Sequence, residues 1–193
     1  MIIDMHMHEM RYSGDSFLRL ENMVEIAKRR GLDGICITDH DSMGLKEFAA
    51  EYSEKTGFPI FVGIEFYSLQ GDIVAFGIED YPKERIPAQE FVDLVQAQGG
   101  MCFSAHPFRN NNRGLEENLK IVKGLDGIEV LNGSTLYEAN RKAAEYAAEL
   151  GLATVGSSDC HVPEKLGIYA TYFPREIRSV QELIRSVKRC ETL

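Results

Sequence analysis

All five histidines of the chain stand in short polar stretches, and four of them have an acidic residue within two positions. His6 and His8 are two residues apart, and Asp159 and His161 repeat that spacing near the other end of the chain. Side chains at positions i and i+2 of a strand point to the same side, so a pair with this spacing can bind one ion together. Imidazole and carboxylate ligands suit zinc, manganese or iron. These residue types therefore point to divalent-metal chemistry.

The other candidate ligands each have an ordinary interpretation when taken singly. His40 follows Thr-Asp, and Asp39 before it is also a plausible helix cap. His106 precedes a proline and could be a buried histidine bonded to the backbone. Glu65 ends an apolar run, where an unpaired carboxylate is costly. The placement of all of them at equivalent points of the predicted fold favours a metal site over these separate interpretations.

The elements that must position these residues alternate between short apolar runs and longer amphipathic runs. We expect strands at 2–3, 34–38, 59–64, 72–78, 101–105, 127–131, 152–155 and 168–173. We expect helices at 16–30, 45–55, 87–98, 115–122, 135–150 and 180–187. This alternation predicts an α/β fold with a mostly parallel sheet, and we prefer a closed or distorted (β/α) barrel to an open doubly wound sheet. Every histidine then lies at or just beyond the carboxyl end of a strand, which is the face where barrels of this kind build active sites.

Composition narrows the class of protein. The chain has 193 residues, of which 44% are hydrophobic and 26% charged, so we expect one globular domain over residues 1–193. The net charge of −9 disfavours a dedicated nucleic-acid-binding surface but allows a small phosphorylated substrate. No signal peptide and no apolar stretch long enough to span a membrane is evident, and the four cysteines lack a CxxC spacing. We therefore expect a cytoplasmic protein with no membrane partner; the oligomeric state is not readable from the sequence.

Five segments together resemble the motifs of the PHP (polymerase and histidinol phosphatase) family. They are His6-Met-His8, Thr38-Asp39-His40-Asp41, Gly63-Ile64-Glu65, Ala105-His106-Pro107 and Ser158-Asp159-Cys160-His161, in the order of that family and over nearly the whole chain. The resemblance implies a distorted seven-stranded (β/α)7 TIM-like barrel with a trinuclear metal centre. It also implies an enzyme that hydrolyses phosphate esters.

The resemblance further implies a set of ligands for two or three divalent ions (Zn, Mn or Fe). The first ion takes His6, His8, Glu65 and Asp159; the second is bridged by Glu65 and held by His106; the third takes His40, His161 and Asp15. Related proteins often have histidine where this chain has Asp72, which is either a harder ligand of the second ion or an ordinary turn aspartate.

Our leading hypothesis is hydrolysis of a phosphate monoester or small diester by a metal-activated water. Arg109 is the candidate cation for the phosphate oxygens or else a solvated loop residue, and Asp39 or His161 is the candidate acid for the leaving oxygen. We expect Glu129 to orient the ligating side chains by contacting them, without binding an ion itself. The alternatives are a metal-dependent hydrolase of C–N or C–O bonds and a non-catalytic module that binds metal or phosphate. The identity of the substrate is not readable from the sequence.

Overall fold

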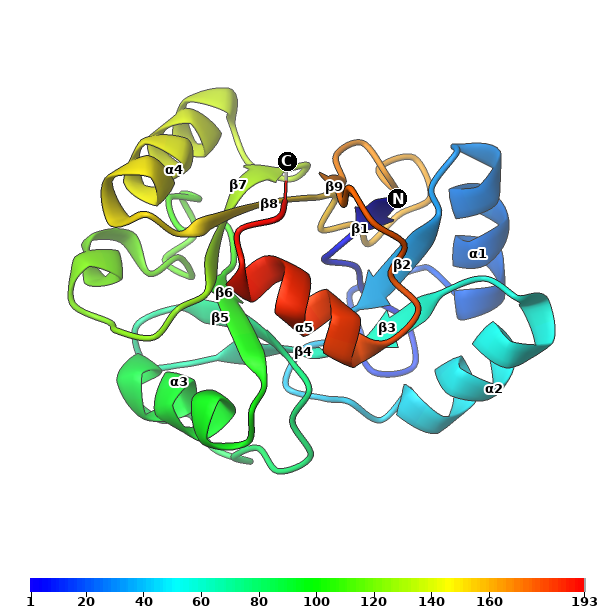
Figure 1. Ribbon diagram of the computed structural model, residues 1–193, viewed down its shortest axis with the longest axis horizontal. Helices are drawn as coiled ribbons and strands as arrows, with labels where there is room; N and C mark the ends of the chain where they lie inside the picture. The colour runs from blue at the N-terminus through cyan, green and yellow to red at the C-terminus, as the bar shows by residue number, and fades with distance from the viewer. Residues whose placement is uncertain (193) are drawn as a thin grey trace.

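Two β-sheets form the centre of the structure, a computed structural model that describes residues 1–192 (Figure 1). The first sheet has the order β3 (Ile60–Val62), β2 (Gly34–Ile37), β1 (Ile2–Asp4) and β9 (Thr171–Tyr172). The second has the order β4 (Ile64–Tyr67), β5 (Asp72–Phe76), β6 (Met101–Ser104), β7 (Gly127–Asn132) and β8 (Ala153–Ser157). The fold is therefore mixed α/β.

The strand directions differ from those of the predicted (β/α)7 TIM-like barrel. Strands β1, β2 and β3 are parallel, as are β6, β7 and β8, but β9 runs antiparallel to β1, and β5 runs antiparallel to both β4 and β6. No helix separates β4 from β5. The described residues thus form two sheets and not one continuous closed barrel.

The chain passes from one sheet to the other at Gly63, inside the run 59–64 that the sequence predicted as one strand. A Cβ at this position would overlap the Ala75 carbonyl and lie 2.7 Å from the Phe76 ring, so only glycine fits there. Isolated bridges link the sheets again: His40, beyond the end of β2, pairs with Glu65 near the start of β4, and Met7, beyond β1, pairs with Cys160, beyond β8.

Helices surround the two sheets (Figure 1). They are α1 (Leu20–Arg29), α2 (Lys46–Thr56), α3 (Ala88–Ala97), α4 (Tyr137–Leu150) and α5 (Val180–Lys188), with a short 3₁₀ helix at Glu116–Lys120 where a full helix was predicted. Leu183, Ile184 and Val187 of α5 pack into the apolar core that residues of both sheets share. This packing joins the two sheets through one core. Among residues 1–192, no helix is long and apolar enough to cross a bilayer.

Two helices begin later than predicted, because the hydroxyl groups of their predicted first residues, Ser16 and Thr135, bond elsewhere. The residue before α1 is Arg19, and the Ser16 hydroxyl donates to the His8 carbonyl at 2.7 Å. The residue before α4 is Leu136, and the Thr135 hydroxyl donates to Asn132 Oδ1 at 2.9 Å. Both hydroxyls therefore stabilise the loops that follow strands.

Asp4 ties the end of β1 to the loop after β8. It is fully buried, and its carboxylate accepts the backbone N–H groups of Ser158 (2.9 Å), Gly167 (3.0 Å) and His6 (3.5 Å). Burial raises its pKa to about 6, and the same hydrogen bonds oppose that shift. The strand that carries His6 and the loop that carries Asp159 are thus fixed to one another.

We expect Asp4→Asn to lower the free energy of unfolding by about 1–3 kcal/mol, because the amide NH₂ faces a backbone donor that the carboxylate oxygen accepted. Urea unfolding at pH 7.5, followed by circular dichroism, measures this change. The exposed Glu51→Gln in α2 is the control and should stay within about 0.5 kcal/mol of the parent. Equal stability of all three proteins contradicts the assignment.

Candidate metal centre

The five histidines converge although they come from distant parts of the chain. His6 and His8 follow β1, His40 follows β2, His106 follows β6 and His161 follows β8. They surround a pocket of about 140 Å³ at the carboxyl ends of these strands. The pocket is lined by Asp15, His40, Glu65, Asp72, His106, Arg109, Asn111, Arg113, Asp159 and His161. His6 and His8 lie beneath it, fully buried.

The spacing of the innermost ligand atoms fits a shared cation. His6 Nε2 lies 3.0 Å from His8 Nε2 and 3.3 Å from Glu65 Oε1, and His8 Nε2 lies 3.3 Å from Asp159 Oδ1. Two ligands at roughly 2.1 Å from one ion, at 90° to 109°, are about 3.0–3.4 Å apart. Three overlapping sets have ligand atoms within 4.8 Å of one another: His6–His8–Asp159, His6–Glu65–His106 and His8–His40–His161.

His40, His161 and Asp15 form the outer part of the cluster, where ring nitrogens again lie close to carboxylate oxygens. His40 Nδ1 lies 2.7 Å from Glu65 Oε2, yet this buried nitrogen makes no hydrogen bond in the described structure. On the other side of its ring, His40 Nε2 lies 3.3 Å from Asp15 Oδ2, and His161 Nε2 lies at the same distance from the same oxygen. Asp15 is the most exposed member, with a side chain 60% accessible. A ring nitrogen that makes no hydrogen bond, beside a carboxylate, fits a cation bound between the two.

Glu129 fixes the His6 ring from behind. His6 Nδ1 lies 3.2 Å from Glu129 Oε1, to which the Ser157 hydroxyl also donates. The other oxygen of Glu129 accepts the His106 backbone N–H at 2.6 Å and the Asn132 amide at 3.0 Å. A proton held on Nδ1 leaves Nε2 as the acceptor that faces the pocket. Glu129 thus has the orienting geometry that the sequence predicted.

Ser13 and Asp39 orient the ring of His8 in the way that Glu129 orients the ring of His6. His8 Nδ1 donates to Ser13 Oγ at 3.2 Å, and Ser13 Oγ donates to Asp39 Oδ1 at 2.8 Å. Asp39 also accepts the Glu9 N–H at 2.6 Å and does not line the pocket. This geometry argues against Asp39 as the leaving-group acid, since its carboxylate is turned away from the site. Ser13 was missed because only Asp15 of that loop was considered as a ligand.

Burial and charge act in opposite directions on the ring pKa values. Burial lowers the pKa of His8 to about 4. Burial also opposes protonation of His6, but the Glu129 and Glu65 carboxylates outweigh it and raise the His6 pKa well above its usual value. Glu65 likewise outweighs burial at His40 and raises its pKa to about 9. A metal that binds here must displace these protons, so binding is coupled to proton release.

Two site aspartates are paired with arginines in different ways. Asp159 Oδ2 accepts Arg109 Nη1 at 2.7 Å, which leaves Oδ1 facing the histidines. Both oxygens of Asp72 accept from Arg113, at 2.6 and 2.9 Å. Asp72 Oδ2 lies 3.7 Å from His106 Nε2, and Asp72 is in none of the three metal-capable sets.

The backbone is strained at two of the predicted ligands. His106 has φ 27° and Asp159 has φ 49°, in the left-handed region that L-residues seldom adopt. Each follows directly after a strand and a short turn, where the change of direction aims the side chain at the pocket. Strain of this kind costs about 1–3 kcal/mol per residue and is concentrated at functional sites.

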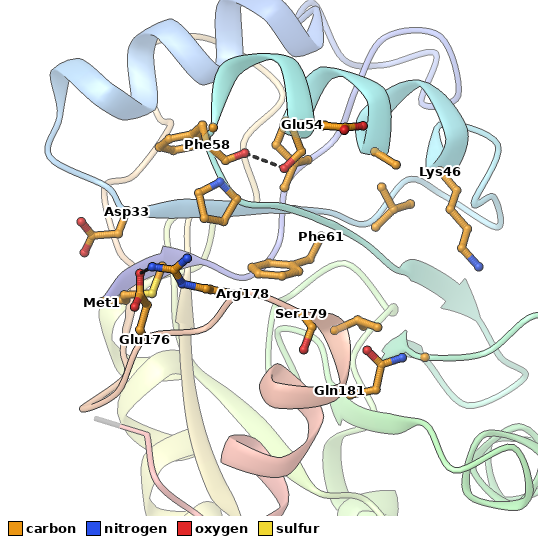
Figure 2. Close-up of a pocket in the computed structure, with 18 of the residues that line it drawn as sticks. Met1, Asp33, Lys46, Glu54, Phe58, Phe61, Glu176, Arg178, Ser179 and Gln181 are labelled. Carbon is orange, nitrogen blue, oxygen red and sulfur yellow. Dashed lines mark hydrogen bonds and ion pairs between the residues drawn. The ribbon is translucent and has the colours of Figure 1, made fainter.

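A larger cavity lies elsewhere in the described structure. It has a volume of about 850 Å³ and lies between α2, β3 and the start of α5 (Figure 2). Its walls include Phe58, Phe61 and Ser179, and none of the five histidines. The larger cavity has carboxylates in its lining but no histidine, so histidine and carboxylate come together only at the smaller of these two pockets.

We expect Ser13→Ala to weaken binding of Mn²⁺ about 10- to 100-fold, because the His8 tautomer is no longer fixed. Isothermal titration of the metal-stripped protein measures the dissociation constant. Ser53→Ala in α2 is the matched control. It removes a hydroxyl that donates to the Phe58 carbonyl, and it should bind Mn²⁺ with the affinity of the parent. Equal affinity of the Ser13 and Ser53 variants contradicts the relay.

Comparisons with known proteins agree with this arrangement. Residues 137–192 match a family model described as PHP-associated. Two uncharacterised proteins of Methanocaldococcus jannaschii are similar in sequence. One is 28% identical over 140 residues, which are 67% of this chain and 80% of that protein. The other is 24% identical over 176 residues, 86% of this chain and 68% of that protein.

Solved structures share the fold. A protein from Bifidobacterium adolescentis assigned as a metal-dependent phosphoesterase superposes with a TM-score of 0.73 at 20% identity, over 87% of this chain and 91% of that one. An amidohydrolase from Chromobacterium violaceum gives 0.72 at 20% identity, over 99% and 97%. A lesion-specific endonuclease from Pyrococcus furiosus gives 0.73 at 17% identity, over 97% of this chain and 56% of that one. The PHP-associated match is confined to residues 137–192, and the solved structures, at 17–20% identity, show that the fold is shared.

Proposed function

We propose that this protein is a metal-dependent hydrolase of phosphate esters, acting on a small phosphomonoester or nucleotide-type substrate. The observation that carries the proposal is the convergence of five histidines with Glu65 and Asp159 on one pocket, with ligand atoms at the spacing of a shared cation. Burying ionisable groups is costly, because they lose their hydration. An apolar core would stabilise the fold at lower cost, so the cluster is better explained by a function than by stability.

Each residue has a role in this proposal. His6, His8 and Asp159 would hold one ion, and His40, His161 and Asp15 another, with Glu65 between them. Bound divalent ions supply a lowered pKa for a water molecule and positive charge for the phosphate oxygens. Arg109 lines the same pocket and can donate to a phosphate oxygen. His161, at the outer rim with 23% of its side chain exposed, binds the ion through Nε2 in this arrangement and is therefore not free to give a proton to the leaving oxygen.

Arginine at the rim favours a phosphate ester over the two alternatives. Arg109 and Arg113 line the pocket, and a planar guanidinium matches the oxygens of a phosphate. An amide or lactone substrate gives these cations no anionic group to bind. A small substrate also suits the pocket volume of about 140 Å³ and the acidic surface.

We expect Glu65→Gln to lower kcat by more than about 100-fold, since replacing even an outer residue of a metal site costs about 10- to 100-fold. Its metal content, measured by inductively coupled plasma mass spectrometry, should fall together with kcat. Glu51→Gln in α2 serves as the control and should keep both values. A Glu65→Gln variant with full activity contradicts the assignment.

Removal of metal should abolish phosphate release, and reloading should restore it. The protein is stripped with a chelator, reloaded with Mn²⁺, Fe²⁺ or Zn²⁺, and assayed on a panel of phosphomonoesters and nucleotides. We also expect thermal unfolding to shift upward on reloading, since a ligand at 100 times its Kd stabilises by about 2.7 kcal/mol.

The same panel separates the alternatives. Hydrolysis of amides or lactones without phosphate release points to the C–N or C–O hydrolase. Tight binding of metal and inorganic phosphate with no turnover on any compound points to the non-catalytic module.

A further inference from the structure

The three metal-capable sets share ligand atoms, which limits how many ions they can hold. His6 Nε2 belongs to two sets and His8 Nε2 to two. The Nδ1 atoms of these rings are occupied by Glu129 and Ser13. One nitrogen lone pair binds one ion, so an ion held by His6, His8 and Asp159 removes both histidines from the other two sets.

The two remaining positions are not equal. At the outer position, His40 and His161 keep Asp15, whose Oδ2 lies 3.3 Å from the Nε2 atoms of both rings. At the Glu65–His106 corner, defined here as the space beside Glu65 Oε1 and His106 Nε2, only those two ligands remain, 2.9 Å apart. Catalytic sites for transition metals normally use three protein ligands. The corner therefore needs Asp72.

Asp72 is already fully engaged. Both of its oxygens accept from Arg113, and Asp72 itself is 0% exposed. An ion on the same oxygens would lie beside a permanently charged guanidinium. Asp159 shows the contrast, because Arg109 takes only its Oδ2 and leaves Oδ1 facing the histidines.

The fold holds Arg113 in this place. The Asp72 N–H donates to the Arg113 carbonyl at 2.6 Å, so the backbone of the two residues is paired as well. Gly71 lets the two segments approach, since a Cβ there would lie 2.6 Å from the Gly114 carbonyl carbon. The guanidinium also stacks over the Tyr67 ring, 4.4 Å from its centroid. The backbone hydrogen bond and the Tyr67 ring therefore hold the Asp72–Arg113 ion pair in place without any bound ligand.

We propose that Arg113, anchored on Asp72, excludes an ion from the Glu65–His106 corner and supplies the positive charge there, so that this chain holds two metal ions and not three. The inference rests on the metal centre of the proposed function. Arg113 lines the pocket with 32% of its side chain exposed, so a substrate anion in the pocket meets a guanidinium at this corner.

Metal counting tests the proposal without an activity assay. The stripped protein is reloaded with excess Mn²⁺ and desalted, and Mn per chain is measured by inductively coupled plasma mass spectrometry. Anomalous diffraction from crystals of the same sample locates the ions. We expect two ions in the parent, with no anomalous peak beside His106 and Asp72.

Arg113→Ala should bind a third ion at the corner, because Asp72 is then free beside Glu65 and His106. Arg85→Ala is the matched control: Arg85 stacks on the same Tyr67 ring at 3.7 Å but donates to the Ser68 carbonyl, so this variant should keep two ions. If circular dichroism shows that Arg113→Ala does not fold, Arg113→Gln replaces it and is also expected to bind three ions.

The outcomes are distinct. Three ions in the parent, or two in a folded Arg113 variant, overturn the proposal for Arg113 and leave the hydrolase function standing. No bound ion in the parent overturns the metal centre itself and this inference with it. Two ions in the parent and three in the Arg113 variant support both the metal centre and the proposal for Arg113.

Discussion

The Glu65 carboxylate contacts histidines from three different strand ends, and its backbone joins the two sheets. His40, His106 and His6 each place a ring nitrogen 2.7 to 3.3 Å from one of its oxygens. The Glu65 N–H donates to the Asp39 carbonyl at 3.1 Å, and the Asp41 N–H donates to the Glu65 carbonyl at 2.9 Å. A carboxylate with 1% exposure must recover several kcal/mol of lost hydration. The imidazoles of His6, His40 and His106 are the partners that offset this loss.

The sequence predicted the location of the site better than its detail. Polar residues that directly follow apolar runs must meet at one end of the strands, whichever way the sheet closes, so His6, His40 and His106 were found from their positions alone. The closed barrel was wrong because β4 and β5 pair antiparallel without a helix between them. The signal was Gly63, where a side chain would collide with β5, but a glycine inside an apolar run does not by itself reveal a change of sheet.

What the sequence could not predict are contacts between segments that meet only in three dimensions. Asp72 and Arg113 are separated by 41 positions, and their pairing depends on how the loop of Arg113 rests on Gly71. The relay from His8 through Ser13 to Asp39 crosses from one strand end to another. Residue type suggested Asp72 as a ligand and Asp39 as an acid. Partner geometry, which no pattern contains, pairs Asp72 with Arg113 and Asp39 with Ser13.

The arginines also resolve a tension between the net charge of −9 and an anionic substrate. Surface charges act over about 8 Å at physiological ionic strength, so the distant acidic residues have little effect inside the pocket. There Arg109 and Arg113 are held by Asp159 and Asp72 and cannot move away. Four carboxylates line the same pocket, so under the proposed function bound divalent ions would supply most of the positive charge that a small phosphate ester meets there. A long polyanion would also meet the acidic surface along its whole length, so the proposal favours a small substrate over a polymer.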